Sequence, residues 1–550
     1  MPAFPRKRLA DREILSANAT GRRIMRPSTI VAAPRALGCL SGRCFGGARS
    51  AAPCFRSFSQ SRRFSQQQQP AEKQEERKWS TPLAKQLFEA ISTTGPVPLA
   101  SYMRMCLTGD LGGYYSGAIG QGRDQFGAKG DFITSPEISQ MFGELVGVWF
   151  IAEWISQGRP SQGVQLIEVG PGRGTLMDDV LRTVQRFPAM ASAVDSVFMV
   201  EASRALRDAQ KTLLCGPDAP STESKVGYHS TGKHLGKPIV WTETIKSIPI
   251  EPDKMPFIVA HEFFDALPIH TFQTAPAKQT KPAAGSTPQE QQRQQRVDNP
   301  GPPAMEWREM MVSPVPPAAL TPLLTTTTSS SSSSSSSSNA DDPATSPPEF
   351  QLILSSAPTR HSRYLPDSSP RYRALKHTPS ALIEVCPDAS LYASDFAARI
   401  GGSPQHPKPT PSGAALVLDY GTADTIPVNS LRGIRHHRLV SPFAAPGLVD
   451  LSADVDFTAI AEAATRASDG VEVHGPVPQA DFLELMGIRE RAEMLTKGAP
   501  KETAETVDKA WRRLVDRGPN GMGKVYKALA ILPENDGRRR PVGFGGDVRG

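Results

Sequence analysis

The sequence predicts an α/β fold built on a parallel, doubly wound sheet. Three observations predict it. Short apolar runs alternate with amphipathic helical segments, one such run is joined to a helix by a glycine-rich turn, and acidic residues follow the ends of several runs. In sheets of this kind ligands bind beyond the carboxyl ends of the strands. The candidate site of the 550-residue chain is therefore expected at those ends.

The helices are expected where apolar residues recur at helical spacing behind a capping residue. Thr81 precedes Pro82 at the start of the first helix, and Ser135 is expected to cap a long helix that runs from Pro136 to about Ser156. Between them, residues 111–130 are rich in glycine and aromatic residues and predict a loop. Further helices are expected around residues 102–105 and at 175–187, 203–214, 391–400, 457–467 and 479–495.

The strands are expected at short apolar runs bounded by turn residues. Residues 216–238 predict a loop, and residues 523–532 predict a last strand at the edge of the sheet. The other strands are expected at residues 166–169, 196–201, 239–241, 257–260, 381–387 and 414–421.

Charge is concentrated at the N-terminus. Residues 1–70 contain 12 Arg and one Lys against two acids, a surplus of 11, whereas the whole chain has a formal charge of +7, which leaves −4 for the rest. The basic pI is therefore no sign of nucleic-acid binding. An Arg- and Ser-rich, acid-poor segment is typical of a mitochondrial transit peptide, and the alternative is a disordered basic tail. No apolar run in the sequence is long enough to span a membrane.

Composition divides the chain into ordered and low-complexity parts. Ten consecutive serines, Ser329 to Ser338, lie in a segment rich in Pro, Gln and Thr, which cannot bury enough apolar area to fold. The predicted organisation is a transit peptide at 1–65, a linker at 66–78, a first core part at 79–273, a disordered insertion at 274–348 with a possible strand at 305–312, a second core part with a helical addition at 349–533, and a disordered tail at 534–550.

The six cysteines suggest neither a disulfide framework nor a metal site. Three lie within residues 1–65, and the other three, Cys106, Cys215 and Cys386, are more than 100 residues apart. No pair has the spacing of metal ligands, so no metal is expected, and a reducing compartment fits.

Residues 165–176 read QLIEVGPGRGTL, which is strand, glycine turn and helix. A Walker loop would need Lys and Ser or Thr after the last glycine, and a dinucleotide fingerprint needs G-x-G-x-x-G, whereas Gly170, Gly172 and Gly174 are spaced G-x-G-x-G. With Glu168 two residues before the turn, the pattern resembles the first motif of class I S-adenosylmethionine-dependent methyltransferases. Glycines let the backbone approach the cofactor closely. An ordinary tight turn is the alternative.

Two further acids follow strand ends. Glu201 ends the next strand, where a carboxylate can accept both ribose hydroxyls of such a cofactor; the alternative is a solvated acid. Glu262 and Asp265 lie in HEFFDALP, beside Phe263 and Phe264, at the end of a buried strand. Carboxylates beside aromatic rings suit a guanidinium, which they can orient and deprotonate. Alternatively, Asp265 caps the following turn and the two phenylalanines belong to the core.

The ordered series GDFITSPEIS, IEVGPGRGTLMDDVLR, VEAS, HEFFDALP, WRE, LDYG and DLSADVDF resembles the MidA family. The resemblance covers roughly residues 80–275, 305–312 and 380–530. It implies a class I methyltransferase fold with an added helical part and S-adenosyl-L-methionine as cofactor. It further implies a mitochondrial matrix enzyme that symmetrically dimethylates an arginine in the 49-kDa-type subunit of respiratory complex I and assists assembly of that complex.

Site residues follow from the resemblance by position. It implies that the acid and glycines of the turn and Glu201 bind the cofactor. It also implies that the segment 130–137, with Thr134 and Glu137, closes over the cofactor, and that Glu262 and Asp265 lie in the active site. The family more often has Asn where this chain has His261, which is kept as a catalytic candidate with an open role.

Two questions stay open at this stage. His436 and His437 lie in a basic loop, which is more typical of a solvated surface than of substrate contact. The function itself has two alternatives, a non-catalytic assembly factor that binds the cofactor, and a methyltransferase of small molecules. The sequence indicates no oligomeric state.

Overall fold

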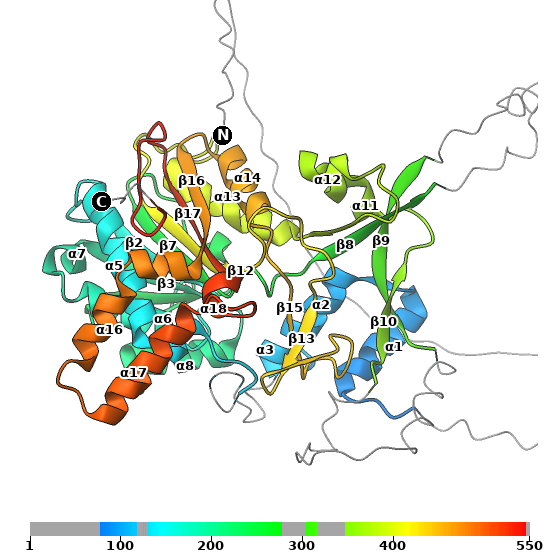
Figure 1. The fold of residues 1–550 in the computed structure, drawn as a ribbon, viewed down its shortest axis with the longest axis horizontal. Coiled ribbons are helices and arrows are strands. Elements are labelled where there is room, and N and C mark those ends of the chain that lie inside the picture. Colours follow the sequence, from blue (N-terminus) through cyan, green and yellow to red (C-terminus); the bar gives the residue numbers. More distant parts are fainter. Residues whose placement is uncertain are drawn as a thin grey trace, which may run out of the picture. The chain divides into compact units, whose positions relative to one another are not determined.

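The computed structural model describes residues 77–117, 125, 127, 130–277, 304–316 and 347–545. The predictions for the transit peptide at 1–65, most of the linker and most of the insertion lie outside these residues. Contacts group residues 76–550 as one compact unit (Figure 1). In the described part no helix is long and apolar enough to cross a membrane.

The helices and strands follow one another along the chain as the alternation in the sequence predicts. The helices are α1 (Pro82–Thr94), α2 (Leu99–Thr108), α3 (Tyr114–Gly117), α4 (Ser135–Ile138), α5 (Gln140–Ser156), α6 (Thr175–Val184), α7 (Pro188–Ala193), α8 (Arg204–Cys215), α11 (Arg360–Tyr364), α12 (Pro370–Ala374), α13 (Pro387–Gly401), α14 (Phe457–Ala467), α15 (Gln479–Leu485), α16 (Ile488–Thr496), α17 (Lys501–Leu514) and α18 (Met522–Val525). The strands are β1 (Val97–Pro98), β2 (Val164–Val169), β3 (Val194–Val200), β4 (Thr222–Glu223), β5 (Tyr228–Thr231), β6 (Pro238–Thr242), β7 (Met255–His261), β8 (His270–Pro276), β9 (Met305–Pro314), β10 (Phe350–Leu354), β11 (Leu382–Val385), β12 (Ala414–Tyr420), β13 (Arg432–Arg435), β14 (Arg438–Val440), β15 (Asp450–Ser452), β16 (Val471–Pro478) and β17 (Tyr526–Pro533).

The central sheet has nine strands in the order β16-β17-β12-β7-β2-β3-β6-β5-β4. The five strands from β12 to β6 run parallel, whereas β17 pairs antiparallel with both β12 and β16. The expected parallel, doubly wound sheet is confirmed. The chain reverses direction across the sheet between β2 and β7, and the carboxyl ends of these strands are where a ligand is expected.

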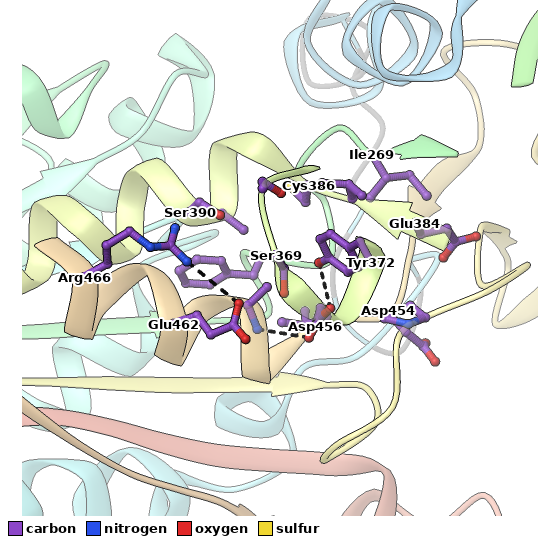
Figure 2. A pocket seen from close by; sticks show the side chains of 17 residues that line it. Ile269, Ser369, Tyr372, Glu384, Cys386, Ser390, Asp454, Asp456, Glu462 and Arg466 are labelled. Atoms are coloured by element: carbon purple, nitrogen blue, oxygen red, sulfur yellow. Dashed lines mark hydrogen bonds and ion pairs between the residues drawn. The ribbon is translucent and has the colours of Figure 1, made fainter. Parts of the chain in front are cut away.

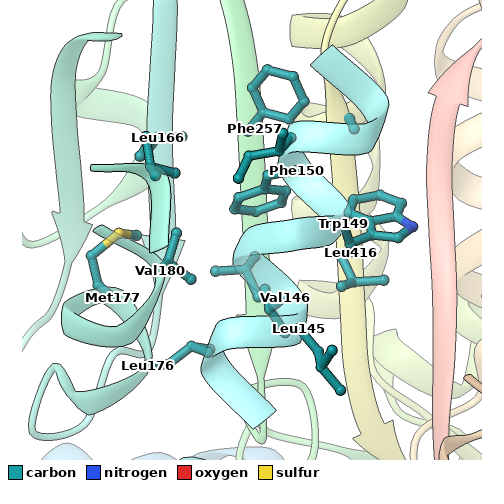
Figure 3. Packing of buried hydrophobic residues seen from close by; sticks show 14 of the residues in the cluster. Leu145, Val146, Trp149, Phe150, Leu166, Leu176, Met177, Val180, Phe257 and Leu416 are labelled. Carbon is teal, nitrogen blue, oxygen red and sulfur yellow. The ribbon is translucent and has the colours of Figure 1, made fainter. Parts of the chain in front are cut away.

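Helices cover both faces of this sheet, as the apolar runs of its strands require. Along β12, Leu416 belongs to a cluster with α5, α6 and α15 to α17, and the next residue, Val417, belongs to a cluster with α13 and α14. Figure 3 shows Trp149 and Phe150 of α5 lying over the sheet near Phe257 and Leu416. Trp149 and Phe150 are completely buried, and burial of such a ring stabilises the fold by about 2–3 kcal/mol.

Two smaller sheets accompany the central one. β1, β8, β9, β10 and β11 form an antiparallel sheet, and β13, β14 and β15 form another. A third apolar cluster joins α1 and α2 to both, for example through Leu87, Val312 and Leu451. The strand expected at 305–312 corresponds to β9, which pairs with β8 and β10.

Several helices differ from the predictions at their ends. Thr134, not Ser135, is the cap of α4, because the Thr134 and Glu137 side chains form a reciprocal capping box. The long helix expected from Pro136 is interrupted at Ser139, whose side chain accepts a hydrogen bond from Met141 N and caps α5. The helix expected at 479–495 is likewise two helices, separated at Gly487, which has a left-handed backbone.

The strand predictions need corrections too. β17 is not at the edge, because β16, a strand that the sequence did not predict, pairs with its outer side. The segment 216–238 contains the short strands β4 and β5, and the basic loop is the hairpin β13–β14. The tail was expected to be disordered, yet Trp149 donates to Val542 O and Phe544 is buried against α5.

Candidate active site

The glycine turn connects β2 to α6, as the sequence predicts. Gly170, Gly172 and Gly174 all have positive φ angles, 68°, 52° and 85°. A Cβ atom on Gly170 would lie 2.5 Å from the ring of Phe263, so no larger side chain fits there. Gly174 caps α6 and packs against Gln210. It is the one glycine of the three that does not line the large cavity described below, so it shapes the turn and not the cavity.

Glu168 lies inside β2, one residue before its end, and is 2% exposed. Burial raises the pKa of this carboxyl well above its usual value, and the nearby Glu201 carboxylate raises that pKa further. Among the described residues, Glu168 Oε2 has no hydrogen-bond partner. A buried oxygen of this kind calls for a donor or cation from a ligand.

Glu201 follows β3, the strand parallel to β2. Glu201 Oε1 accepts a hydrogen bond from Ser203 N at 2.8 Å, and Oε2 accepts one from Gln210 Nε2 at 3.4 Å. Burial raises the pKa of Glu201 to about 7, although these hydrogen bonds oppose the shift. Gln210 also donates to Gly172 O at 2.7 Å, so one side chain joins the acid to the glycine turn.

A cavity of about 810 Å³ opens at these strand ends. Its volume lies within the range of small-molecule sites. Nine of the ten predicted site residues line it, and only Gly174 is outside it. The predicted residues that line the cavity are Thr134, Glu137, Glu168, Gly170, Gly172, Glu201, His261, Glu262 and Asp265.

The segment before α5 borders the same cavity. Glu137 Oε2 accepts a hydrogen bond from Thr134 N at 3.2 Å, and Glu137 Oε1 lies 3.5 Å from Arg173 Nη1 in the glycine turn. Asp131 joins this segment to the β13–β14 hairpin, because it accepts hydrogen bonds from His436 N and from the Tyr114 hydroxyl. The glycine turn and residues 130–137 are therefore joined by the contact between Arg173 and Glu137.

His261 ends β7 and is buried against Phe142, with ring centroids 5.0 Å apart. Burial lowers the pKa of His261 to about 3, so the imidazole is neutral at physiological pH. His261 Nε2 lies 3.3 Å from Glu262 Oε1. The two atoms make no hydrogen bond, so the neutral imidazole packs beside Glu262 without supplying a charge.

Glu262 has a φ angle of +48°, which is unusual for a residue with a side chain. Such backbone is found where the surrounding structure enforces it, often at active sites. Here Asp419, which is completely buried, accepts hydrogen bonds through Oδ2 from the backbone N–H groups of the three residues that follow, Phe263 at 3.1 Å, Phe264 at 2.8 Å and Asp265 at 3.4 Å. Asp419 therefore holds the turn that carries both candidate acids.

The Asp265 side chain does not hold residues 263–265, because Asp419 accepts their N–H groups. The Asp265 side chain accepts a hydrogen bond from the Tyr420 hydroxyl, which also contacts Ser452 Oγ. Asp265 Oδ1 has no hydrogen-bond partner in the described part of the chain. Burial raises the pKa of Asp265, and burial together with the neighbouring carboxylates raises that of Glu262 well above its usual value. Both acids therefore favour their neutral forms more than exposed acids do.

Of the two phenylalanines, Phe264 belongs to the core, being 3% exposed, whereas Phe263 lines the cavity. Tyr420 and Tyr526, whose ring centroids are 5.1 Å apart, also line the cavity. The Arg432 guanidinium lies 4.7 Å from the centroid of the Tyr420 ring.

Sequence reasoning missed Asp419, Tyr420, Asp450, Ser452 and Tyr526. A signal was present for the first four, because LDYG and DLSADVDF belong to the family pattern, but nothing in the sequence gave any of the five a role. His436 and His437 lie at the exposed turn of the hairpin and do not line the cavity, although their backbone N–H groups both bond to Asp131.

A second, much smaller cavity of about 50 Å³ lies beside α12, α13 and α14. Figure 2 shows Tyr372 and Asp456 bonded across it, with Glu462 and Arg466 on the neighbouring helix. It shares Asp454 with the large cavity but contains none of the predicted site residues, so we assign it no ligand.

The large cavity fits the cofactor implied by the sequence. The Glu168 oxygen without a partner suits the ammonium group of S-adenosyl-L-methionine, and Glu201 suits ribose hydroxyls. The described residues therefore offer acceptors for these two parts of the cofactor.

Comparison with known proteins supports the same cofactor. Residues 145–477 match a family described as S-adenosyl-L-methionine-dependent methyltransferases, Methyltransf_28. The protein arginine methyltransferase NDUFAF7, mitochondrial, of Rattus norvegicus is 32% identical over 82% of this chain and 85% of its own length. The Xenopus laevis protein of the same name is 33% identical over 84% of this chain and 87% of its own length.

The fold is also found in a solved structure. A COG1565 superfamily member from Burkholderia thailandensis, described as a likely methyl transferase bound to S-adenosyl-homocysteine, superposes with a TM-score of 0.53. It is 20% identical in sequence, and the match covers 85% of this chain and 93% of that one. The chain therefore belongs to the MidA family of S-adenosyl-L-methionine-dependent methyltransferases, which includes the NDUFAF7 proteins.

Proposed function

We propose that this protein methylates arginine side chains of a protein substrate. The observation that carries the proposal is the position of Glu262 and Asp265, which lie at the end of β7 in the same cavity as the cofactor residues Glu168 and Glu201. Two buried acids beside the ring of Tyr420 suit a planar cation.

The chemistry that we propose for this site is transfer to a guanidinium nitrogen. When bound, S-adenosyl-L-methionine supplies an electrophilic methyl group. Asp265 accepts hydrogen bonds from the guanidinium, and the guanidinium charge lowers the raised pKa of Glu262 towards its ordinary value. Glu262 would then accept the proton that the nitrogen loses as its lone pair forms the new N–C bond and the bond between the methyl carbon and sulfur breaks. His261 packs beside Glu262 and does not exchange a proton, since its imidazole stays neutral.

We further propose the substrate and the place. The family resemblance and the NDUFAF7 relatives, whose name states that they are mitochondrial arginine methyltransferases, support symmetric dimethylation of an arginine in the 49-kDa-type subunit of complex I. The Arg-rich composition of residues 1–65 supports import into the mitochondrial matrix.

The test is a labelling reaction with the full-length protein. Purified protein is incubated with S-adenosyl-L-methionine labelled in its methyl group and with a mitochondrial extract depleted of the endogenous enzyme. We expect one dominant labelled protein band of the mass of the 49-kDa-type subunit, and acid hydrolysis of this band is expected to release labelled symmetric dimethylarginine.

The control is Glu262→Gln, which keeps the size of the side chain and removes the proton acceptor. We expect it to bind the cofactor and to label nothing. Label in small molecules alone would support the small-molecule alternative, and normal complex I levels in cells that carry only Glu262→Gln would support the non-catalytic assembly factor. Either result contradicts the proposal.

A further inference from the structure

Three metal-binding side chains meet outside the active site, on the sheet formed by β8 and β9. His270 Nδ1 lies 2.7 Å from Glu309 Oε1, and His361 Nδ1 lies 3.3 Å from the same oxygen. The three ligand atoms all lie within 4.8 Å of one another. None of these residues lines the large cavity. The cluster is therefore a separate feature from the candidate active site.

The fold places these side chains together by strand pairing and by one helix cap. Phe272 of β8 is directly opposite Glu309 of β9, so His270, two residues earlier on β8, projects from the same face. The Thr359 hydroxyl caps α11 by accepting from Ser362 N and itself donates to Glu309 Oε2. This cap brings the start of α11, and with it His361, over Glu309.

Burial makes a bound cation favourable at this position. The Glu309 side chain is completely buried, the His270 side chain is 10% exposed, and the His361 side chain is 43% exposed. A buried carboxylate needs a positive partner. A metal ion held by all three side chains would supply positive charge and would leave a position on the side of His361, the most exposed of the three, that solvent can reach.

We infer that His270, Glu309 and His361 bind one Zn²⁺ ion. Two imidazole nitrogens and one carboxylate oxygen are ligands that zinc takes, at about 2.0–2.2 Å, which puts tetrahedral ligand atoms about 3.3 Å apart. The separation between His361 and Glu309 already has this value, and that between His270 and Glu309 has to widen by about 0.6 Å, a change that a small rotation of one side chain supplies. Mg²⁺ and Ca²⁺ prefer oxygen ligands and are disfavoured.

The ion would fasten α11 to the β8–β9 pair. Zn²⁺ bound to the folded protein raises its thermal stability in proportion to the logarithm of the metal concentration above the dissociation constant. Because the inference concerns metal binding and stability, it does not depend on the proposed methylation.

The experiment uses the full-length protein, freed of metal by dialysis against a chelator. ZnCl₂ is titrated into it by isothermal calorimetry, and the midpoint of thermal unfolding is recorded with and without the metal. We expect one tight site and a rise in the midpoint. His361→Gln changes an exposed ligand, so the variant is expected to fold, to bind zinc at least 100-fold more weakly and to lose the metal-dependent rise.

The matched control is His377→Gln, which changes an exposed histidine 16 residues further along the same segment and outside the cluster. Its titration and its midpoint should follow those of the unchanged protein, which also accounts for zinc held by cysteines elsewhere in the chain. Equal zinc affinity in His361→Gln and the unchanged protein, or a midpoint that zinc does not move, would show that the cluster is a hydrogen-bonded ion pair only.

Discussion

The two halves of the large cavity are built in different ways. The cofactor half consists of Glu168, the glycine turn and Glu201, which belong to two successive strand–helix units. The acceptor half consists of side chains from β7, β12, β15 and β17, whose positions in the chain extend from Glu262 to Tyr526. The first half is local in sequence, and the second half exists only after strands far apart in the chain have paired.

The difference predicts which measured quantity a substitution in each half changes. A change in the cofactor half should act on the cofactor's dissociation constant, because we propose that these residues bind the cofactor. A change in the acceptor half should act on turnover, because these residues hold or perform the proton transfer. The four predictions below test this division, from the largest expected effect to the smallest.

The largest effect is expected for Glu262→Gln. Removing the proton acceptor should lower kcat by about 10³-fold, while the cofactor dissociation constant changes less than threefold. Single-turnover methyl transfer and calorimetric binding measure the two quantities. A variant that keeps kcat but binds the cofactor weakly would place Glu262 in the cofactor half and break the comparison.

Gly170→Ala should have the opposite signature. The new Cβ atom would lie 2.5 Å from the Phe263 ring at a φ angle of 68°, so the turn has to shift. We expect the cofactor to bind about 100-fold more weakly, with much of the turnover recovered at saturating cofactor. Gly216→Ala, at a positive φ angle with no atom within 4 Å, controls for backbone strain alone and should leave binding unchanged.

Asp419→Asn tests whether the acceptor half depends on long-range support. The amide keeps the shape but has one acceptor oxygen, whereas Asp419 uses Oδ2 for the N–H groups of residues 263–265 and Oδ1 for Tyr420 N. We expect kcat to fall about 30-fold and the KM for the protein substrate to rise, with unchanged cofactor affinity. If cofactor affinity fell in parallel, Asp419 would have to act on the whole fold and not as a positioning residue.

Glu201→Gln sharpens the comparison through pH. Accepting ribose hydroxyls favours the ionised carboxylate, and the pKa of Glu201 in the free protein is raised to about 7, so a proton has to leave when cofactor binds below that pH. Cofactor affinity should therefore rise with pH, by up to tenfold per unit below pH 7, and level off above it. In the variant this part of the rise should disappear, with binding about tenfold weaker at pH 8. Calorimetry between pH 5.5 and 8.5 measures it, and equal slopes in both proteins would contradict the role of Glu201.

Prediction from the sequence worked where the signal was contained in a short stretch. The helix expected at 457–467 is α14 with the same bounds, and the strand expected at 414–421 is β12, which ends one residue earlier. Prediction failed where strand pairing determines the place of an element in the sheet. β17 has an apolar run that would suit a strand anywhere in a sheet. It is an interior strand only because β16, which is interrupted by Gly475 and Pro476, pairs with its outer side.

The same holds for the site. Glu168 and the glycine turn could be found by counting residues, because a strand–turn–helix unit puts them together whatever the rest of the chain does. Asp419 and Tyr420 could not, since their partners at 263–265 are about 155 residues away and meet them only through the parallel pairing of β7 with β12. The zinc site that we propose is a further example, because its ligands lie 39 and 52 residues apart and no spacing rule connects them.

By itself the sequence determined the α/β class, the cofactor turn with its acid, and the acids at the end of β7, because local periodicity and short-range turn geometry encode these features. Only the tertiary structure decided that Gly174 shapes the turn without lining the cavity, that Asp419 and not Asp265 holds the turn after β7, and that burial makes His261 neutral. The physical reason is that hydrogen-bond partners, burial and the pKa values that depend on them are properties of neighbours in space, which a chain acquires only when its distant segments have packed.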